Sequence, residues 1–300
     1  MSLTTLVFVK QVPDTQNITG EAMKEDGTVN RSALPAIVNP EDLNGIELAL
    51  ELRERYGGKV VVCTMGPPTA SNILRYALYM GADETILLTD KKFAGADTLS
   101  TSYTLACAAQ TFGEYDLIIC GRQAIDGDTA QVGPQLAEKL QLPQVTYLEK
   151  VESVDKNSMR LRRLIEGGYE VLDCPLPALV TTVSTANIPR PAGAKRLMAY
   201  KKAMTPSELQ AKHSDSDYED ANLIAEETEK LKSRGLWIHE WTAKDIDADP
   251  ERIGMAGSPT KVKNIESVVL TGKESTTTVE PTDQGIKNLV HDLIEDHILS

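Results

Sequence analysis

Short apolar runs and amphipathic stretches alternate through roughly the first 150 residues of this chain. Apolar runs of strand length occur at residues 4–9, 59–63, 85–88, 116–120 and 145–148. Such runs are typical of parallel strands that are buried on both faces. Helix-like stretches lie between them at residues 41–56, 67–79, 97–112 and 129–140. The alternation predicts right-handed βαβ units, and therefore an α/β fold whose parallel sheet carries helices on both faces.

The pattern changes after residue 150. Three β-rich pieces follow at residues 159–165, 169–172 and 178–183, and Gly167-Gly168 predicts a hairpin turn between the first two. Residues 185–206 contain three prolines and several basic residues with little periodicity, which predicts an extended surface segment.

The last third of the chain predicts less regular structure. An acidic stretch at residues 214–230 predicts a helix, and residues 242–265 are expected to be irregular. Residues 283–299 predict an amphipathic helix with one apolar stripe, made of Ile286, Leu289, Val290, Leu293, Ile294 and Ile298. This stripe must be covered either by the chain's own core or by a partner.

Composition excludes several classes of function. A net charge of −13 over 300 residues opposes binding to nucleic acid or to an anionic membrane surface. No apolar run approaches the ~18 residues of a membrane span, and the first residues lack the features of a signal peptide. We therefore expect a cytoplasmic protein with no membrane insertion.

Cysteine and histidine spacing does not indicate a metal site. Cys63, Cys107, Cys120 and Cys174 form no C-x-x-C pair, and three of them lie in or beside apolar runs. They are expected to be buried, reduced thiols.

Candidate binding residues follow the predicted strands, because ligands of open parallel sheets lie beyond the carboxyl ends of the strands. The loops there are Lys10–Thr15, Asn39–Asp42, Thr64–Pro68 and Gly121–Thr129. The last of these leads into a predicted helix, whose free N–H groups and dipole favour a phosphate. Gly127 permits close approach of the backbone, and Thr129 adds a hydroxyl.

Two acidic residues in that loop leave the interpretation open. Asp126 and Asp128 would repel a phosphate unless their carboxylates turn away from it. The alternative is that Asp128 caps the helix and no ligand binds. Familiar motifs do not decide the question: there is no G-x-G-x-x-G after the first strand, no P-loop, and no recognisable catalytic set. A missing catalytic set suits a protein whose chemistry is done by a bound cofactor.

Several separate motifs carry a family resemblance. They are Val38-Asn39-Pro40-Glu41-Asp42, Gly66-Pro67, Met80-Gly81-Ala82-Asp83, Gly121–Asp128, and the hairpin region Arg163–Thr181 with Glu166-Gly167-Gly168. In this order they resemble the beta subunit of electron-transfer flavoproteins, over roughly residues 4–205. The resemblance implies the adenine-nucleotide alpha-hydrolase-like, Rossmann-like version of the α/β fold. It divides the chain into a nucleotide-binding domain, residues 1–205, and a C-terminal extension for partner-subunit contact, residues 206–300.

In the resembling family, this subunit binds AMP or FAD, and its alpha partner binds a second FAD. The implied cofactor-binding residues are Val9, Lys10, Pro13, Asp14, Thr15, Asn39, Asp42, Met65, Gly121, Arg122, Gln123, Ala124, Asp126, Gly127, Asp128, Thr129, Ala130, Gln131 and Val132. Asp97 and Thr98 are expected either to touch the flavin side of the cofactor or simply to cap a helix.

The loop Lys10–Thr15 resembles the version found in electron-bifurcating members, where the beta subunit carries FAD. The resemblance then implies that NADH is the electron donor. One electron would go to ferredoxin or flavodoxin, and the other through the alpha-subunit FAD to a dehydrogenase. A plain electron carrier with structural AMP is the main alternative. An ATP-cleaving enzyme ranks last, because Lys10–Thr15 is not a Ser/Gly-rich pyrophosphate loop.

One departure from the family concerns the dehydrogenase partner. The partner-recognition loop is expected near Pro189–Met198, but Gly193 and Ala194 replace the apolar anchor in its middle. The resemblance therefore leaves both an acyl-CoA dehydrogenase and a lactate-type flavin dehydrogenase as partners.

Overall fold

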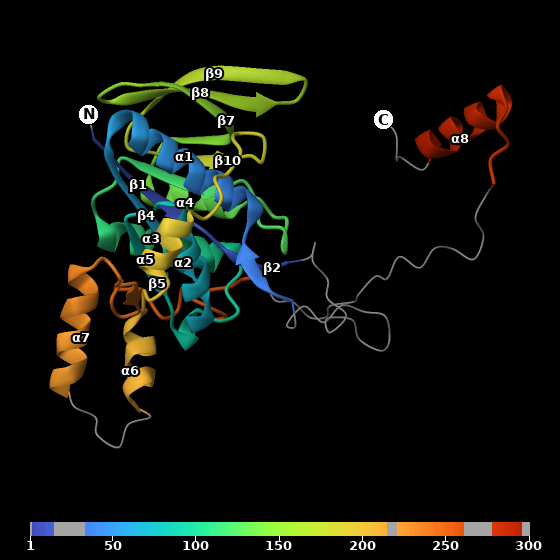
Figure 1. Ribbon diagram of the computed structural model, residues 1–300. Coiled ribbons are helices and arrows are strands. Elements are labelled where there is room, and N and C mark those ends of the chain that lie inside the picture. The colour runs from blue at the N-terminus through green and yellow to red at the C-terminus, as the bar shows by residue number, and fades with distance from the viewer. Residues whose placement is uncertain (1, 15–33, 215–220, 261–277, 296–300) are drawn as a thin grey trace. The chain divides into compact units, whose positions relative to one another are not determined.

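A nine-stranded sheet forms the centre of the main unit. The computed structural model describes residues 2–14, 34–214, 221–260 and 278–295. The strand order is β11-β5-β4-β1-β6-β10-β7-β8-β9, and Figure 1 shows the last three strands together at one edge. In chain order these strands are β1 (Leu3–Phe8), β4 (Gly58–Met65), β5 (Glu84–Leu88), β6 (Leu117–Gly121), β7 (Gln144–Val154), β8 (Ser158–Ile165), β9 (Gly168–Pro175), β10 (Ala178–Thr182) and β11 (His239–Trp241).

The seven strands from β11 to β7 in the sheet order pair in parallel, and only β8 and β9 add antiparallel pairs. The predicted α/β fold is therefore confirmed. The central strands are rich in apolar residues because they are buried on both faces. In β10, for example, all five residues are buried. Two short strands, β2 (Gln11–Pro13) and β3 (Ala36–Val38), form a separate antiparallel pair next to the end of β1.

Helices cover both faces of the sheet, as predicted. Helices α1 (Pro40–Tyr56) and α2 (Ser71–Met80) pack with Val7 and Val62 in one apolar cluster. Helices α3 (Thr98–Phe112) and α4 (Val132–Leu140) pack with Leu6 and Val61 in a second cluster. Neighbouring residues on one strand thus pack on opposite faces of the sheet, because side chains alternate along a strand. Two 3-10 turns, Pro68–Ala70 and Lys91–Phe93, follow the ends of β4 and β5.

The structure corrects two local predictions. Helix α4 begins at Val132 rather than Thr129, because Asp128 and Ala130 have φ values of 49° and 52° and cannot belong to a right-handed helix. The segment predicted to be extended contains helix α5 (Ala194–Tyr200), which buries none of its residues. A helix with no buried face leaves no apolar period in the sequence.

The main compact unit includes the described residues up to Thr260, beyond the boundary predicted at residue 205. Helices α6 (Pro206–Ser214) and α7 (Ala221–Ser233) lie side by side (Figure 1), and β11 extends the main sheet by pairing with β5. Helix α8 (Asp283–Glu295) belongs to a second unit and exposes the predicted stripe, with Ile286 54% and Leu289 39% exposed. The predicted end of this helix, residues 296–299, lies outside the described residues.

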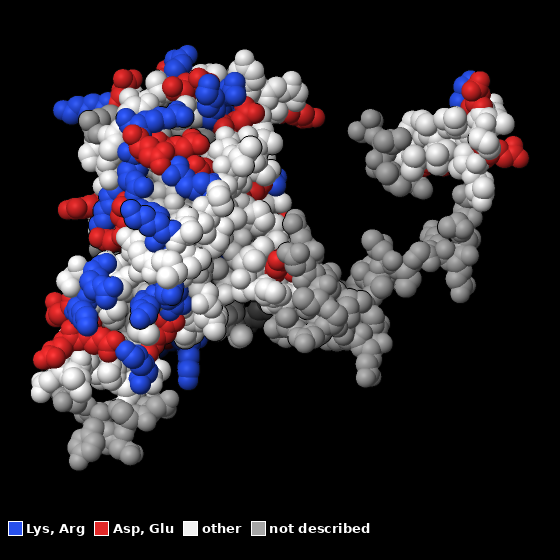
Figure 2. All heavy atoms as spheres, in the orientation of Figure 1, with Lys and Arg blue, Asp and Glu red and all other residues white. Residues whose placement is uncertain are grey.

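Within the described residues, no helix is long and apolar enough to cross a membrane. Figure 2 shows Lys and Arg side chains interleaved with Asp and Glu on the visible face of the main unit, without one continuous basic surface there. All four cysteines are buried and free, as predicted. Burial raises the pKa of the Cys63 and Cys120 thiols, which keeps them protonated and unreactive.

Candidate functional site

A cavity of about 400 Å³ lies at the carboxyl ends of β1, β4 and β6. This is the edge at which open parallel sheets bind ligands. One wall is the loop between β6 and α4, and another is the segment Phe93–Thr98 between β5 and α3. Its volume lies within the range of ~300–1,000 Å³ that is usual for small-molecule sites.

The structure brings most of the predicted site residues to this cavity. Those that line it are Val9, Lys10, Asp42, Met65, Gly121, Arg122, Gln123, Ala124, Gly127, Asp128, Thr129, Ala130, Gln131 and Val132. Pro13, Asp14, Asn39 and Asp126 do not line it, and Thr15 lies outside the described residues.

Other lining residues were missed from the sequence. They are Phe8, Phe93, Gly95, Ala96, Thr101, Leu105, Cys120 and Gly133. The segment around Gly95 and Ala96 follows a parallel strand at the same edge, so the carboxyl-end rule could have found it. Asp97 and Thr98, considered from the sequence, do line the cavity. Asp97 also caps α3, accepting a hydrogen bond of 3.0 Å from the Ser100 N–H.

Asp42, near the start of α1, ties two strand ends together. Its carboxylate accepts hydrogen bonds from the Lys10 N–H (2.7 Å) and the Gly121 N–H (3.0 Å). This approach requires glycine at position 121, because a Cβ there would lie 2.3 Å from Asp42 Oδ1. Burial raises the pKa of Asp42 to about 7, although the two N–H groups favour the charged form.

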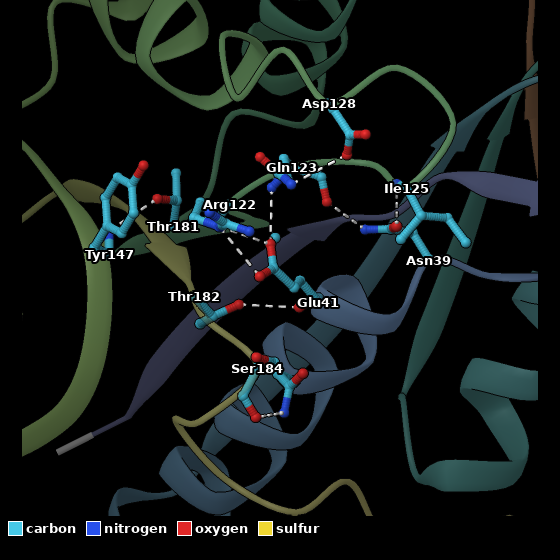
Figure 3. Close-up of polar contacts among 12 residues, drawn as sticks. Asn39, Glu41, Arg122, Gln123, Ile125, Asp128, Tyr147, Thr181, Thr182 and Ser184 are labelled. Atoms are coloured by element: carbon cyan, nitrogen blue, oxygen red, sulfur yellow. Dashed lines mark hydrogen bonds and ion pairs between the residues drawn. The ribbon is translucent and has the colours of Figure 1, made fainter. Parts of the chain in front are cut away.

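Asn39 and Glu41, from the same end of α1, hold the loop after β6 (Figure 3). Asn39 Oδ1 accepts from the Ile125 N–H (3.1 Å), and its Nδ2 donates to the Gln123 carbonyl (2.9 Å). Glu41 accepts from the Gln123 N–H (3.0 Å). Asn39 therefore shapes the cavity through the loop and does not line it.

Arg122 is fixed beside the cavity by two neighbours. Its Nε lies 3.2 Å from a Glu41 carboxylate oxygen, and its guanidinium lies 5.5 Å from the ring centroid of Tyr147. The hydrogen bond to Glu41 raises the pKa of Arg122, so the guanidinium stays charged. The loop thus carries a fixed positive group next to its backbone.

The two acidic residues of the loop already have partners. Asp126 forms an ion pair of 2.7 Å with Lys10, and Asp128 accepts a hydrogen bond of 3.1 Å from the Gln123 side chain. The alternative that Asp128 caps α4 is wrong, since Gln131 is the N-cap residue and no side chain caps this helix.

Backbone donors of the same loop are available for a ligand. The N–H groups of Thr129, Ala130 and Gln131 donate to no acceptor in the part of the chain that the structure describes. A Cβ built on Gly127 would meet no atom within 4 Å, so the backbone there is open. Successive free amides beside a helix N-terminus form an anion-binding arrangement.

Comparisons with known proteins agree with this geometry. Residues 26–207 match the family model described as "Electron transfer flavoprotein domain". A chain of Clostridium acetobutylicum named "Electron transfer flavoprotein subunit beta" is 40% identical over 295 residues, covering 98% of this chain and 99% of the relative. The chain belongs to the electron transfer flavoprotein beta-subunit family. The predicted resemblance is thus confirmed at the level of the family.

Other relatives in the electron transfer flavoprotein family are named as parts of reductase complexes. One is the "Caffeyl-CoA reductase-Etf complex subunit CarD" of Acetobacterium woodii, 39% identical over 98% of this chain and 99% of its own length. Another is the "Acryloyl-CoA reductase electron transfer subunit gamma" of Anaerotignum propionicum, 36% identical over 98% of each chain. Both alignments extend well past residue 207, so the C-terminal extension is shared with these electron transfer flavoprotein chains.

Proposed function

We propose that this chain is the beta subunit of an electron transfer flavoprotein heterodimer and binds FAD in the cavity at the edge of the sheet. The observation that carries the proposal is the row of free N–H groups at Thr129, Ala130 and Gln131, three residues that line the cavity. The two nearby carboxylates are engaged by Lys10 and Gln123, so they do not occupy these amides. The residues present therefore fit the phosphate groups of an adenine nucleotide.

Different parts of the cavity suit different parts of the cofactor. The amides of residues 129–131 and the Thr129 hydroxyl would hold phosphate. Val9, Met65 and Val132 offer apolar contacts for a flat ring. Asn39, Glu41 and Asp42 would keep the loops in place through their bonds to the backbone, which limits rearrangement when the ligand enters.

The proposed activity is redox chemistry supplied by the cofactor. When bound, FAD would accept a hydride from NADH and pass its electrons singly, one to ferredoxin or flavodoxin and one to the alpha-subunit FAD that feeds a dehydrogenase. The Lys10–Thr15 loop of the sequence supports the FAD-binding subtype. The names of the two reductase-complex relatives favour a dehydrogenase of the acyl-CoA type, and the altered residues Gly193 and Ala194 favour the lactate type.

A structural AMP is the second candidate. Pro13 and Asp14, which belong to the loop that indicates FAD, do not line the cavity. A cavity that these two residues do not line would also suit an adenine mononucleotide. The chain would then be a non-bifurcating electron carrier.

Cofactor stoichiometry separates these candidates. The chain would be purified with its alpha subunit, denatured, and analysed for released FAD and AMP by chromatography. We expect two FAD and no AMP for each heterodimer, and anaerobic NADH should bleach flavin absorbance. One FAD and one AMP would instead establish the carrier function. Recovery of the alpha-subunit FAD alone, with no second nucleotide, would contradict the site.

A further inference from the structure

The extension beyond residue 205 runs along one wall of the cavity. Within it, residues 254–260 lie against residues 92–98, several of which line the cavity. The Met255 N–H donates to the Ala94 carbonyl at 3.0 Å. Gly254 approaches so closely that a Cβ there would lie 1.9 Å from the Lys92 carbonyl oxygen, and its φ of 54° also favours glycine.

Ser258 makes the central contact between the two segments. Its side chain is buried, with the residue 5% exposed. Its hydroxyl accepts a hydrogen bond of 2.8 Å from the Asp97 N–H and donates to the Gly254 carbonyl at 2.7 Å. The Thr260 N–H donates to the Asp97 carboxylate at 3.1 Å. The extension thus holds both the backbone and the side chain of Asp97, a cavity-lining residue.

A second set of contacts fixes the extension to α3 at Tyr103. The Tyr103 hydroxyl accepts from the Asp249 N–H at 3.1 Å, and the Arg252 guanidinium lies 3.9 Å from the centroid of the Tyr103 ring. Ile246 and Ile253 are buried in the apolar cluster that includes the cavity residue Phe93. Since Tyr103 does not line the cavity, this anchor and the Ser258 contact can be tested separately.

We infer that Ser258 is a positioning residue for the nucleotide, which fixes the Gly95–Thr98 wall through the Asp97 N–H. The inference rests on the proposed function, because the cavity must hold FAD or AMP for the wall to matter. Without the hydroxyl, the Asp97 N–H loses the acceptor of its partly buried hydrogen bond, and a donor left without a partner is costly. The wall then relaxes, and the cavity loses the shape that the ligand requires.

The test compares Ser258→Ala, Ser258→Thr and Tyr103→Phe in the full chain, purified with its alpha subunit. FAD would be titrated into complexes whose beta site has been emptied and whose alpha site is filled. Ser258→Ala should raise the dissociation constant of FAD roughly fivefold to tenfold, which corresponds to ~1–1.4 kcal/mol. Ser258→Thr keeps the hydroxyl and should restore binding. Tyr103→Phe removes the α3 hydroxyl that accepts from Asp249 of the same extension and should leave the dissociation constant unchanged.

Amide hydrogen exchange gives a second readout that does not depend on binding. In the nucleotide-free complex, Ser258→Ala should speed exchange of the Asp97 amide, and Tyr103→Phe should not. Wild-type affinity or wild-type exchange in Ser258→Ala would overturn the inference, as would equal weakening by Tyr103→Phe. If the wild-type beta site binds neither FAD nor AMP, the proposed function fails as well, so the two failures are distinguishable.

Discussion

Three neighbouring side chains at the start of α1 hold the cavity loops together. Asn39, Glu41 and Asp42 all bond to backbone groups of other strand ends. Asn39 and Asp42 were predicted from the sequence as cofactor-binding residues. The structure shows that Asn39 holds the loop after β6 without lining the cavity, and that Asp42 lies between the ends of two strands. Sequence spacing identifies this region but not the backbone groups that its side chains bind, because those groups are more than 30 residues away in the chain.

Asp42 should make stability depend on pH. Its folded pKa of about 7 lies above the unfolded value near ~3.9, so the folded chain holds this proton more tightly. The stabilising contribution is complete below about pH 4 and is lost as the pH rises through about 7. In urea unfolding of the complex, the wild-type free energy of unfolding should fall relative to Asp42→Asn across this window, by up to about 4 kcal/mol. Parallel pH profiles for the two proteins would refute this.

At the scale of elements, the apolar runs and helical stretches were sufficient to predict the βαβ pattern. They could not place Ala178–Thr182, because an apolar run does not reveal which strands flank it, and β10 inserts between β6 and β7. The three residues of β11 are too few to form a recognisable run. The start of α4 was misplaced because Ala130, inside the predicted helix, adopts a left-handed conformation that its residue type does not indicate.

The parts of the candidate site that come directly after a strand could be predicted from the sequence. The loop Gly121–Val132 was found because a strand, a glycine-containing loop and a helix follow one another in sequence. The wall at Gly95–Thr98 also follows a strand end and could have been found by the same rule, but its support from Ser258 could not, because Ser258 is more than 150 residues away. Whether these residues bind a nucleotide stays a prediction.

The contact between β6 and α1 should be intolerant of a side chain at position 121. In Gly121→Ala, the new Cβ would lie 2.3 Å from Asp42 Oδ1 and 2.9 Å from the Asp42 backbone nitrogen. Either the carboxylate or the helix must shift, at a cost of about 1–3 kcal/mol. Urea unfolding should show this loss, whereas the control Gly127→Ala, with open space around it, should unfold like the wild type. Equal stability of the two variants would contradict the described packing.

At the scale of the whole molecule, the charge distribution and the C-terminal unit concern contacts with partner proteins. The net charge of −13 is distributed with both signs interleaved on the face in Figure 2. Helix α8 belongs to a separate unit and exposes Ile286, Leu289, Val290 and Ile294. An apolar stripe of this kind on a subunit of a heterodimeric family supports the proposal that the extension contacts the alpha subunit.

A charge placed in that stripe should therefore weaken assembly. Leu289→Asp buries a carboxylate in the proposed contact and should lower the affinity for the alpha subunit by roughly tenfold or more. Asn288→Asp adds the same charge on the opposite side of α8 and should have little effect. Both would be measured by analytical ultracentrifugation of the mixed subunits, and wild-type association of Leu289→Asp would show that the stripe serves another purpose.

The central claim is that open backbone at the loop between β6 and α4 holds an adenine nucleotide. Gly127→Val tests it most directly, because Gly127 lines the cavity and a Cβ there would meet no protein atom within 4 Å, so the new side chain adds bulk to the cavity wall without a clash in the protein. We expect the purified heterodimer to keep its wild-type unfolding profile and alpha-subunit FAD but to lose most of the nucleotide of the beta subunit. Wild-type nucleotide content in the folded Gly127→Val complex would contradict the claim.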